Sequence, residues 1–401
     1  MITQAIGELK YHLSPPHMSG NEINYIIDAF QSNYIAPVGK NIDSFERSIR
    51  NFTGSAYSVA TNSGTSAIHL ALLALGATQQ DIVLCQSFTF AASANPILYQ
   101  NSIPVFIESE HDTWNMDPES LEKAIKASIS GDLEIKTSGD IPLKLPPRKP
   151  KAIVVVHLYG MPAKMEEILA ISEKYDIPVI EDAAEALGSE YKGVPCGTLG
   201  ELGVLSFNGN KIITTSGGGA LLTKNQEHEI LAKKLASQAR ENCLHYEHKH
   251  IGFNYRLSNV SAGIGIAQME VIKARVGQRR KNFSLYQEFL ANNEHVEFLK
   301  EPADYKSNRW LTTIILKDFE NNEQVKDELI RHLFSKGIET RPLWKPLHSQ
   351  PVFSKYPYFG RERVSEDLFS RGICLPSGSS LNWEDIFFIS NEIIDYLNQR
   401  K

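Results

Sequence analysis

One lysine in a short polar turn could act as a nucleophile. Lys211 follows the stretch Ser206-Phe207-Asn208-Gly209-Asn210, and apolar runs at 203–205 and 220–222 flank the turn. Desolvation or a nearby cation at a pocket wall makes a lysine amine a better nucleophile at neutral pH. A solvated surface lysine explains this window equally well, so the rest of the chain must decide.

Two carboxylates follow a short apolar run at 178–180. Asp182 would end that strand, and a buried carboxylate there needs a cationic or N–H partner. Glu185 lies on the same face as Asp182 if a helical turn begins at Asp182. Such a pair could ligate a metal, act as acid and base, or hydrogen-bond a heterocycle. A simple capped helix start is the plainer alternative, because Asp is a common N-cap.

A turn rich in glycine and hydroxyl groups occurs earlier, at Thr61–Ser66. A helix is predicted to begin there, and its free N–H groups together with Gly64, Thr65 and Ser66 could hold a phosphate. An ordinary cap made by Ser63 or Thr65 is the simpler interpretation of this turn taken alone.

Strands and helices that could position these residues alternate along the first half of the chain. Apolar runs predict strands at 56–60, 82–84, 103–106, 152–156 and 178–180. Helices are predicted at 20–32, 91–99, 118–128 and 164–175, the first one packing an apolar face made of Ile23, Ile26, Ile27 and Phe30. This alternation predicts a mostly parallel sheet covered by helices on both faces. Ligands bind at the carboxyl ends of such strands, where Thr61–Ser66, His157, Asp182 and 206–211 fall.

The second half of the chain predicts a smaller α+β domain. A long helical pattern begins at Ser258, and a strand at 311–316, a helix at 323–336, a strand at 371–375 and a helix at 385–397 follow. We therefore expect one domain over 1–257 and a linking helix with a small domain over 258–401. The polar, proline-containing stretch 130–150 is predicted to be a surface insertion.

Composition excludes several classes of protein. The 401 residues are 42% hydrophobic and 22% charged, which is typical of a soluble globular protein. A net charge of −6 offers no basic surface for nucleic acid, and no run of about 18 apolar residues predicts a membrane span. The four cysteines are far apart with no metal spacing, and the N-terminus has no secretory pattern, so we expect a cytoplasmic protein without metal.

Taken together, these features suit pyridoxal 5′-phosphate. That cofactor needs a lysine, an aspartate for its ring nitrogen, a phosphate site and a flat neighbour for its ring. Lys211, Asp182, the turn at Gly64 and the aromatic stretch Phe88-Thr89-Phe90 could supply all four.

Six stretches, in this order, resemble the sugar aminotransferases of the DegT/DnrJ/EryC1 family. They are Asn62–Ala67, Ser87–Asn95, Val156–Gly160, Glu181–Gly188, Ser206–Thr215 and Gly252–Asn259. The resemblance extends from about Ile35 to Leu381. It implies the fold of aspartate aminotransferase (fold type I), an α/β fold, and pyridoxal 5′-phosphate as the cofactor.

The resemblance also implies a role for each matching residue. Lys211 would bind the cofactor covalently and later move the proton, Asp182 would pair with the ring nitrogen, and Glu185 would bond near the ring's phenolic oxygen. Phe90 would stack on the ring, while the N–H groups of Thr65 and Ser66 and the Ser206 hydroxyl would hold the phosphate. Asn254 would reach the phosphate bound by a neighbouring subunit, which implies a homodimer with shared sites.

The turns around Lys211 and the stretch Thr340–His348 are similar to the branch that acts on UDP-linked 4-keto-6-deoxy-N-acetylhexosamines. The implied reaction moves an amino group from L-glutamate to C4 of such a sugar, for surface-glycan synthesis. The remaining candidates for substrate binding are His157, Tyr159, Arg256, Lys345 and His348. A surface charge is as good an interpretation of Arg256, Lys345 and His348. At the strand end that carries His157 and Tyr159, a packed core histidine is as good an interpretation as a pocket residue. A 3- or 4-aminotransferase on a dTDP-linked sugar, another pyridoxal enzyme, and a non-catalytic regulatory member stay open.

Overall fold

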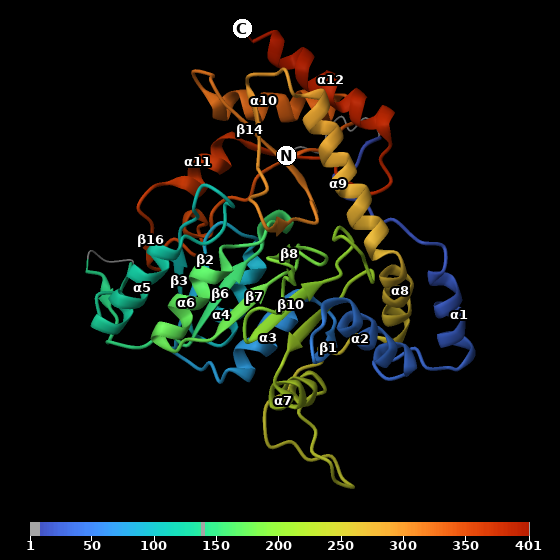
Figure 1. Cartoon of the computed structure of the whole chain (residues 1–401). Helices are drawn as coiled ribbons and strands as arrows, with labels where there is room; N and C mark the ends of the chain where they lie inside the picture. Colours follow the sequence, from blue (N-terminus) through green and yellow to red (C-terminus); the bar gives the residue numbers. More distant parts are fainter. Residues whose placement is uncertain (1–8, 138–140, 401) are drawn as a thin grey trace.

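The computed structural model describes residues 9–137 and 141–400, arranged as a large body below a smaller one (Figure 1). Its helices are α1 (Glu22–Gln31), α2 (Lys40–Thr53), α3 (Gly64–Ala74), α4 (Asn95–Tyr99), α5 (Pro118–Ser130), α6 (Met165–Tyr175), α7 (Gln226–Ala236), α8 (Asn259–Glu270), α9 (Ile272–Phe289), α10 (Asn322–Ser335), α11 (Val364–Arg371) and α12 (Trp383–Asn398). Its longer strands are β1 (Tyr57–Thr61), β2 (Ile82–Gln86), β3 (Ile103–Ile107), β6 (Ala152–Val156), β7 (Val179–Asp182), β10 (Leu202–Ser206), β11 (Gly219–Thr223), β12 (Val296–Phe298), β14 (Thr312–Leu316) and β17 (Gly372–Leu375). The two-residue strands are β4 (Glu134–Ile135), β5 (Leu143–Lys144), β8 (Glu190–Tyr191), β9 (Val194–Pro195), β13 (Tyr305–Lys306), β15 (Arg341–Pro342) and β16 (Tyr358–Phe359).

An eight-stranded sheet forms the centre of the large body. Its order is β1-β11-β10-β7-β6-β2-β3-β16, and β11 alone runs antiparallel to its neighbours. Val154 lies opposite Ile180 where β6 meets β7. The predicted, mostly parallel α/β sheet is confirmed.

Side chains of each central strand alternate between two apolar layers. Val83 and Cys85 of β2 pack on the α3 side of the sheet, whereas Ile82 and Leu84 pack on the side covered by α5 and α6. All five residues of β2 are buried. A strand with both faces covered reads as an unbroken apolar run, which explains why these strands were predictable.

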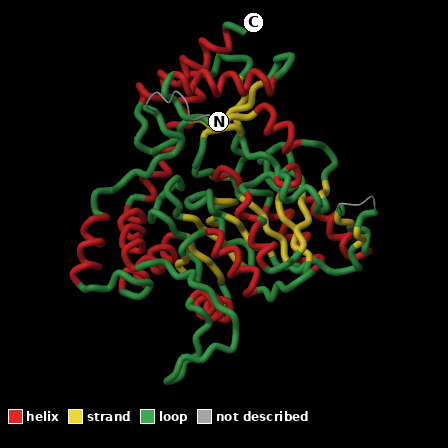
Figure 2. Tube along the Cα trace, turned by 180° about the vertical axis from the view of Figure 1, so that it is seen from behind, coloured by secondary structure: helices red, strands yellow, loops and turns green. Residues whose placement is uncertain are grey.

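The smaller body contains a four-stranded antiparallel sheet, β12-β14-β17-β15, with α9, α10 and α12 packed around it. The α+β character expected for the C-terminal region is present. Two segments cross the expected boundary at residue 257. Tyr11 pairs with Ile338 of the small body, and β16 pairs with β3 of the large sheet. The division into domains therefore stays a prediction (Figure 2 shows the same two bodies from behind).

Several predicted elements differ in detail. The pattern from Ser258 is two helices, α8 and α9, joined at Val271. The 91–99 helix is a 3-10 turn followed by α4. Within the 130–150 insertion, β4 and β5 form a small hairpin anchored by the buried Leu133 and Leu145, and residues 138–140 lie outside the described residues.

Helix α1 contradicts one expectation. Three of the four residues of its predicted packing face are exposed: Ile23 is 55%, Ile27 45% and Phe30 62% accessible, and Ile26 is half-buried. The buried residues of α1 are Glu22 and Ala29, so the side of the helix that faces the protein is not the apolar one. The following loop also exposes large apolar side chains. We call this set the α1 patch, and it comprises Ile23, Ile27, Phe30, Tyr34, Ile35 and Val38.

No helix within 9–137 or 141–400 combines the length and the apolar character needed to cross a bilayer.

Candidate active site

The Lys211 turn crosses the carboxyl end of the large sheet, between β10 and β11. The Lys211 backbone N–H donates to the Asn208 carbonyl at 3.0 Å, which closes the turn. Its Nζ lies 3.3 Å from Glu185 Oε1 and 4.0 Å from the centre of the Trp310 ring, and the side chain is 13% exposed. The amine therefore faces a cavity of 330 Å³ and is not the solvated lysine that the sequence left open.

Asp182 ends β7 at the same cavity, and both of its oxygens are held. Oδ2 accepts from the Ser93 hydroxyl at 2.7 Å, and Oδ1 accepts from the Ala184 N–H at 3.1 Å. These donors are neutral, so the buried carboxylate keeps its negative charge available to a ligand. Residues 183–188 form turns and no helix begins at Asp182, so the helical relation expected for Glu185 is wrong. The reversal of the chain still brings both carboxylates to one cavity.

Glu185 is buried between the lysine and the backbone of Tyr159. Its Oε2 accepts from the Tyr159 N–H at 2.7 Å, while Oε1 faces Lys211. Burial raises the pKa of Glu185, and the ammonium of Lys211 opposes that rise. A metal ion between Asp182 and Glu185 would have to displace this ammonium, which argues against a metal site here.

The predicted phosphate cradle lies at the N-terminus of α3. Ser63 is the N-cap, and its Oγ accepts from the Ser66 N–H at 3.0 Å. That N–H was expected to bind the phosphate, but the cap already occupies it. Gly64 and Thr65 do line the cavity, and their N–H groups have no partner within the helix. A Cβ at Gly64 would lie only 3.1 Å from the Cβ of Ser206, so glycine permits the close approach of helix and strand end.

Two tryptophans in the cavity wall were missed by sequence reasoning. Trp310 and Trp344 come from the C-terminal region. Trp310 stands in no recognisable local chemical motif, and Trp344 lies within the stretch Thr340–His348 but was not singled out there. Phe90, at the mouth of the cavity, is 57% exposed, and its ring centre lies 5.5 Å from that of Trp344. The aromatic wall is thus assembled from both bodies of the protein.

Two predicted substrate residues lie behind this cavity. His157 is fully buried; its Nε2 bonds to Glu181 Oε2 at 2.8 Å, and its Nδ1 accepts from the Ala163 N–H. It is a packed core histidine. Tyr159 is also buried, and its hydroxyl accepts from the backbone N–H of Trp344 at 2.9 Å. Tyr159 therefore supports Glu185 and Trp344 from below without lining the cavity.

The other predicted substrate-binding residues, Arg256, Lys345 and His348, do not line the cavity. Arg256 lies 3.2 Å from the buried Glu46, and Lys345 is exposed. His348 bonds to the Ser87 hydroxyl at 2.7 Å and stacks on Tyr358, and burial lowers its pKa. The contacts of Arg256 and His348 are those of structural residues in this chain.

Asn254 is exposed beside the phosphate cradle. Its carbonyl accepts from Asn62 Nδ2 at 3.1 Å, and Asn62 lines the cavity. The predicted role of Asn254 at a neighbouring subunit's cofactor stays a prediction.

A second cavity of 710 Å³ adjoins the first. The two share Asn210, Trp310 and Trp344 in their walls, and the second is otherwise lined by the N-terminal segment 12–16 and by small-body residues such as Arg341. The two cavities therefore lie side by side, with Trp344 in the wall of both.

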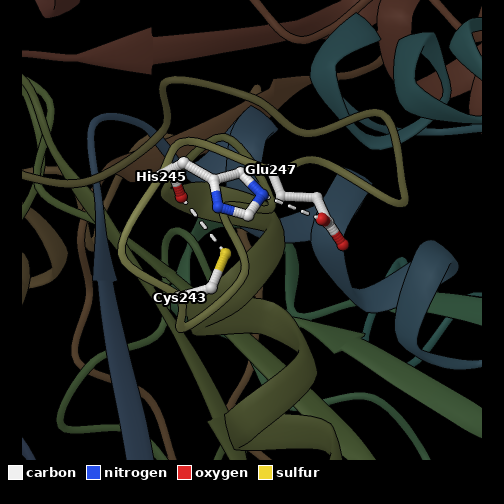
Figure 3. A group of neighbouring side chains, drawn as sticks. All are labelled: Cys243, His245 and Glu247. Atoms are coloured by element: carbon white, nitrogen blue, oxygen red, sulfur yellow. Dashed lines mark hydrogen bonds and ion pairs between the residues drawn. The ribbon is translucent and has the colours of Figure 1, made fainter.

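A separate group of metal-type donors lies on the exposed loop that extends beyond α7 (Figure 3). The donor atoms of Cys243, His245 and Glu247 lie within 4.8 Å of one another. The thiol donates to the His245 carbonyl at 3.1 Å, and the imidazole bonds to Glu247. Cysteine spacing alone does not reveal this set, because its three residues are of different types. All three side chains are at least partly exposed, and none belongs to the cavity around Lys211.

The residues around Lys211 fit pyridoxal 5′-phosphate. A helix N-terminus with a hydroxyl beside it suits a phosphate, a buried carboxylate with neutral partners suits a protonated ring nitrogen, and the enclosed lysine can bond to the aldehyde carbon. Among the described residues that line the cavity, the titratable side chains are Asp182, Glu185 and Lys211.

Comparisons with known proteins agree with this chemistry. The model of the DegT/DnrJ/EryC1/StrS aminotransferase family matches residues 16–393. The putative pyridoxal phosphate-dependent aminotransferase EpsN of Bacillus subtilis is 50% identical over 94% of this chain and 93% of its own. GDP-perosamine synthase of Escherichia coli O157:H7 is 34% identical, covering 96% of this chain and 98% of that protein.

Two further relatives extend the comparison. A UDP-4-amino-4,6-dideoxy-N-acetyl-beta-L-altrosamine transaminase of Campylobacter jejuni is 32% identical over 90% of this chain and 91% of its own. The crystal structure of a DegT DnrJ EryC1 StrS aminotransferase from Brucella abortus has a TM-score of 0.84 at 27% identity and covers 94% of this chain and 95% of that one.

Proposed function

This chain belongs to the DegT/DnrJ/EryC1/StrS aminotransferase family, a family of pyridoxal phosphate-dependent sugar aminotransferases, and we propose which reaction it performs. It transfers the amino group of L-glutamate to C4 of a nucleotide-linked 4-keto-6-deoxy sugar. The sugar nucleotide is UDP-2-acetamido-2,6-dideoxy-hexos-4-ulose, and the product is a 4-amino sugar for surface glycans.

The observation that carries this proposal is the meeting of Lys211, Glu185 and Asp182 in one enclosed cavity. The bound cofactor supplies an electron sink, and the Asp182 carboxylate beside the cavity favours the protonated ring nitrogen on which that sink depends. Lys211 is placed to take a proton from the glutamate Cα and, in the second half of the reaction, to deliver one to the sugar C4. Glu185 orients the amine between these steps.

The two adjoining cavities support a long substrate. A nucleotide sugar is too large for 330 Å³ that it must share with a cofactor, whereas the second cavity provides another 710 Å³. With the sugar at Lys211, the nucleotide would extend past Trp344. The names of two relatives contain GDP- and UDP-linked amino sugars, which supports a nucleotide sugar in general. The similarity around Lys211 and Thr340–His348 favours UDP.

A homodimer with shared sites is part of the proposal. Two carboxylates and one lysine leave the described lining of the cavity without a surplus of positive charge. The substrates carry several negative groups, so cations from a second copy would complete the site. The α1 patch, together with Leu244, Tyr246 and Ile251 on the loop beyond α7, supplies exposed apolar surface for such a partner.

The experiment that tests this function is a transamination assay with ¹⁵N-labelled glutamate. UDP-, GDP- and dTDP-linked 4-keto-6-deoxy sugars are offered in parallel, and NMR locates the new amine and its stereochemistry. We expect label at C4 of the UDP-linked N-acetylated sugar, and none with Lys211→Ala. Faster turnover of a GDP- or dTDP-linked sugar would overturn the choice of nucleotide, and label at C3 would overturn the position.

A further inference from the structure

A guanidinium is buried beneath the active-site turn with no acid beside it. Arg279, on α9, is 1% exposed. Among the described residues no carboxylate pairs with it, and its Nε has no hydrogen-bond partner. Burial, followed by the nearby charge of Arg275, lowers the pKa of Arg279 to about 9. A charge buried without a paired carboxylate is destabilising, and the hydrogen bonds of the guanidinium are what offsets this cost.

The guanidinium donates to Ser14 and to Trp310, and each of these two residues in turn donates to the carbonyl of Asn210, the residue before Lys211. Nη2 donates to Ser14 Oγ at 2.9 Å, and Ser14 Oγ donates to the Asn210 carbonyl at 2.7 Å. Nη1 donates to the Trp310 carbonyl at 2.5 Å, and Trp310 Nε1 donates to the same Asn210 carbonyl at 2.7 Å. The contacts form a closed ring through α9, the N-terminal segment, Trp310 and the lysine turn.

The direction of these bonds is set by chemistry. A serine hydroxyl has one hydrogen, and because Ser14 Oγ accepts from Arg279, that hydrogen goes to Asn210. The charge on Arg279 polarises the hydroxyl and strengthens its bond to the carbonyl. The same peptide unit carries the Lys211 N–H, which donates to Asn208. Polarisation of the Asn210 carbonyl therefore also strengthens the bond that closes the turn.

We propose that Arg279 is a positioning residue for Lys211, acting through Ser14 and Trp310 on the Asn210 carbonyl. It fixes the backbone of the turn, and it fixes the indole ring over which the Lys211 amine lies. A lysine at position 279 would keep the charge but lacks the planar fork that reaches both Ser14 and the Trp310 carbonyl. The inference rests on the transamination of the family and not on which nucleotide sugar is the substrate.

Positioning and plain stability are separable because α9 offers a matched control. Tyr286 is also fully buried on α9, and its hydroxyl donates to the Pro376 carbonyl at 2.9 Å, away from the lysine turn. Tyr286→Phe removes one buried hydrogen bond from the same helix without touching the ring. Ser284→Ala, at an exposed hydroxyl of α9, controls for changes at the surface.

The first measurement is amide hydrogen exchange over residues 206–216, by mass spectrometry on the full chain without cofactor. Arg279→Lys and Ser14→Ala should each speed exchange there about tenfold, the effect of losing a charge-assisted bond. Tyr286→Phe and Ser284→Ala should leave this segment as in the wild type. Ser14→Ala keeps the test valid if Arg279→Lys does not fold.

The second measurement is steady-state kinetics with cofactor bound. Arg279→Lys should lower kcat about tenfold while KM for glutamate and for the keto sugar changes less than about twofold, since Arg279 lines neither cavity. Exchange at 206–216 that matches the wild type in both Arg279→Lys and Ser14→Ala would overturn the proposal. So would equal effects of Arg279→Lys and Tyr286→Phe, because a merely structural role predicts that equality.

Discussion

Glu185 Oε1 lies 3.3 Å from Lys211 Nζ, and both side chains are almost fully enclosed. Without cofactor, this contact gives the buried carboxylate a cationic partner and keeps the amine directed into the cavity. The contact must loosen when Lys211 reacts, so Glu185 then becomes free to accept a different hydrogen bond.

Lys211→Ala should abolish transamination, because the residue both binds the cofactor and moves the proton. A loss of at least about 100-fold in kcat is expected from the proton transfer alone. The measurement is the ¹⁵N assay together with the visible absorbance of the bound cofactor, which should vanish. Lys126→Ala, at an exposed ion pair on α5, is the control. A fully active Lys211→Ala protein would contradict the mechanism.

Asp182→Asn should lower kcat at least about tenfold, because it removes the negative charge at nearly constant shape. The amide oxygen can still accept from the Ala184 N–H, and the new NH₂ group can donate to the Ser93 hydroxyl, so folding should be preserved. Turnover and thermal unfolding are measured on the same preparation. Near-normal turnover would exclude Asp182 from its assigned role.

Glu22→Gln should remove a pH-dependent part of stability. Burial opposes ionisation of Glu22, but the N–H groups of Ser19 and Gly20 and the Gln268 amide outweigh it and lower its pKa to about 2. A depressed carboxyl pKa stabilises the fold above 4.5, the ordinary value, and this contribution is lost as the pH falls from 4.5 to about 2.

Urea unfolding of wild type and Glu22→Gln at a series of pH values measures this contribution. The wild type should be more stable by about 2 kcal/mol near neutral pH, and the difference should shrink below pH 4.5. Glu320→Gln, at an exposed position, should show no such trend. A difference that is constant with pH would contradict the assignment.

Phe30→Asp should weaken the proposed dimer without unfolding the chain, since Phe30 is 62% exposed within one copy. A charge placed at the centre of an apolar contact should raise the dissociation constant about 30-fold or more. Sedimentation over a range of concentrations measures it. Ile141→Asp, at an exposed position in the 130–150 insertion, is the control. Unchanged association of Phe30→Asp would place the interface elsewhere.

Mixed dimers test whether sites are shared. If Asn254 acts at the partner's cofactor, neither Asn254→Ala nor Lys211→Ala homodimers turn over normally, whereas mixing them restores one intact site per mixed dimer. Activity should rise on mixing and subunit exchange. No recovery, with exchange shown by differently tagged subunits, would count against shared sites.

The sequence predicted the structure well where a local pattern of residues alone determines the position of a strand or of a site. Continuous apolar runs predicted β2, β6 and the other central strands, because both faces of those strands are covered. The carboxyl ends of parallel strands then brought Asp182, Gly64 and Lys211 together as expected. At Ser63 the ordinary cap is observed. It uses the Ser66 N–H and leaves those of Gly64 and Thr65 without a helix partner, so it is compatible with the phosphate cradle, which stays a prediction.

The sequence-based predictions were wrong, or missed a residue, where contacts between distant segments determine the position of a side chain. The apolar period of α1 predicts a packed face, but periodicity does not reveal whether a helix packs on its own chain or exposes that face. His157 stands at a strand end like Asp182, yet its ring is directed back to Glu181. Trp310 reaches Lys211 only because α9, Ser14 and β14 lie where they do, and nothing in the residues beside Trp310 signals that neighbour.

Strand β16 has a consequence for synthesis of the chain. Tyr358 and Phe359 complete the large sheet beside β3, whose residues were made about 250 positions earlier. Until they leave the ribosome, Phe106 and Glu108 lack the carbonyl partners of Pro357 and Phe359, and β3 is an open edge. A nascent chain ending before residue 357 therefore holds nearly all of its catalytic groups on a sheet still able to pair with the wrong strand. Emergence of residues 357–359 from the ribosome, and not completion of the N-terminal half, is therefore what covers this edge.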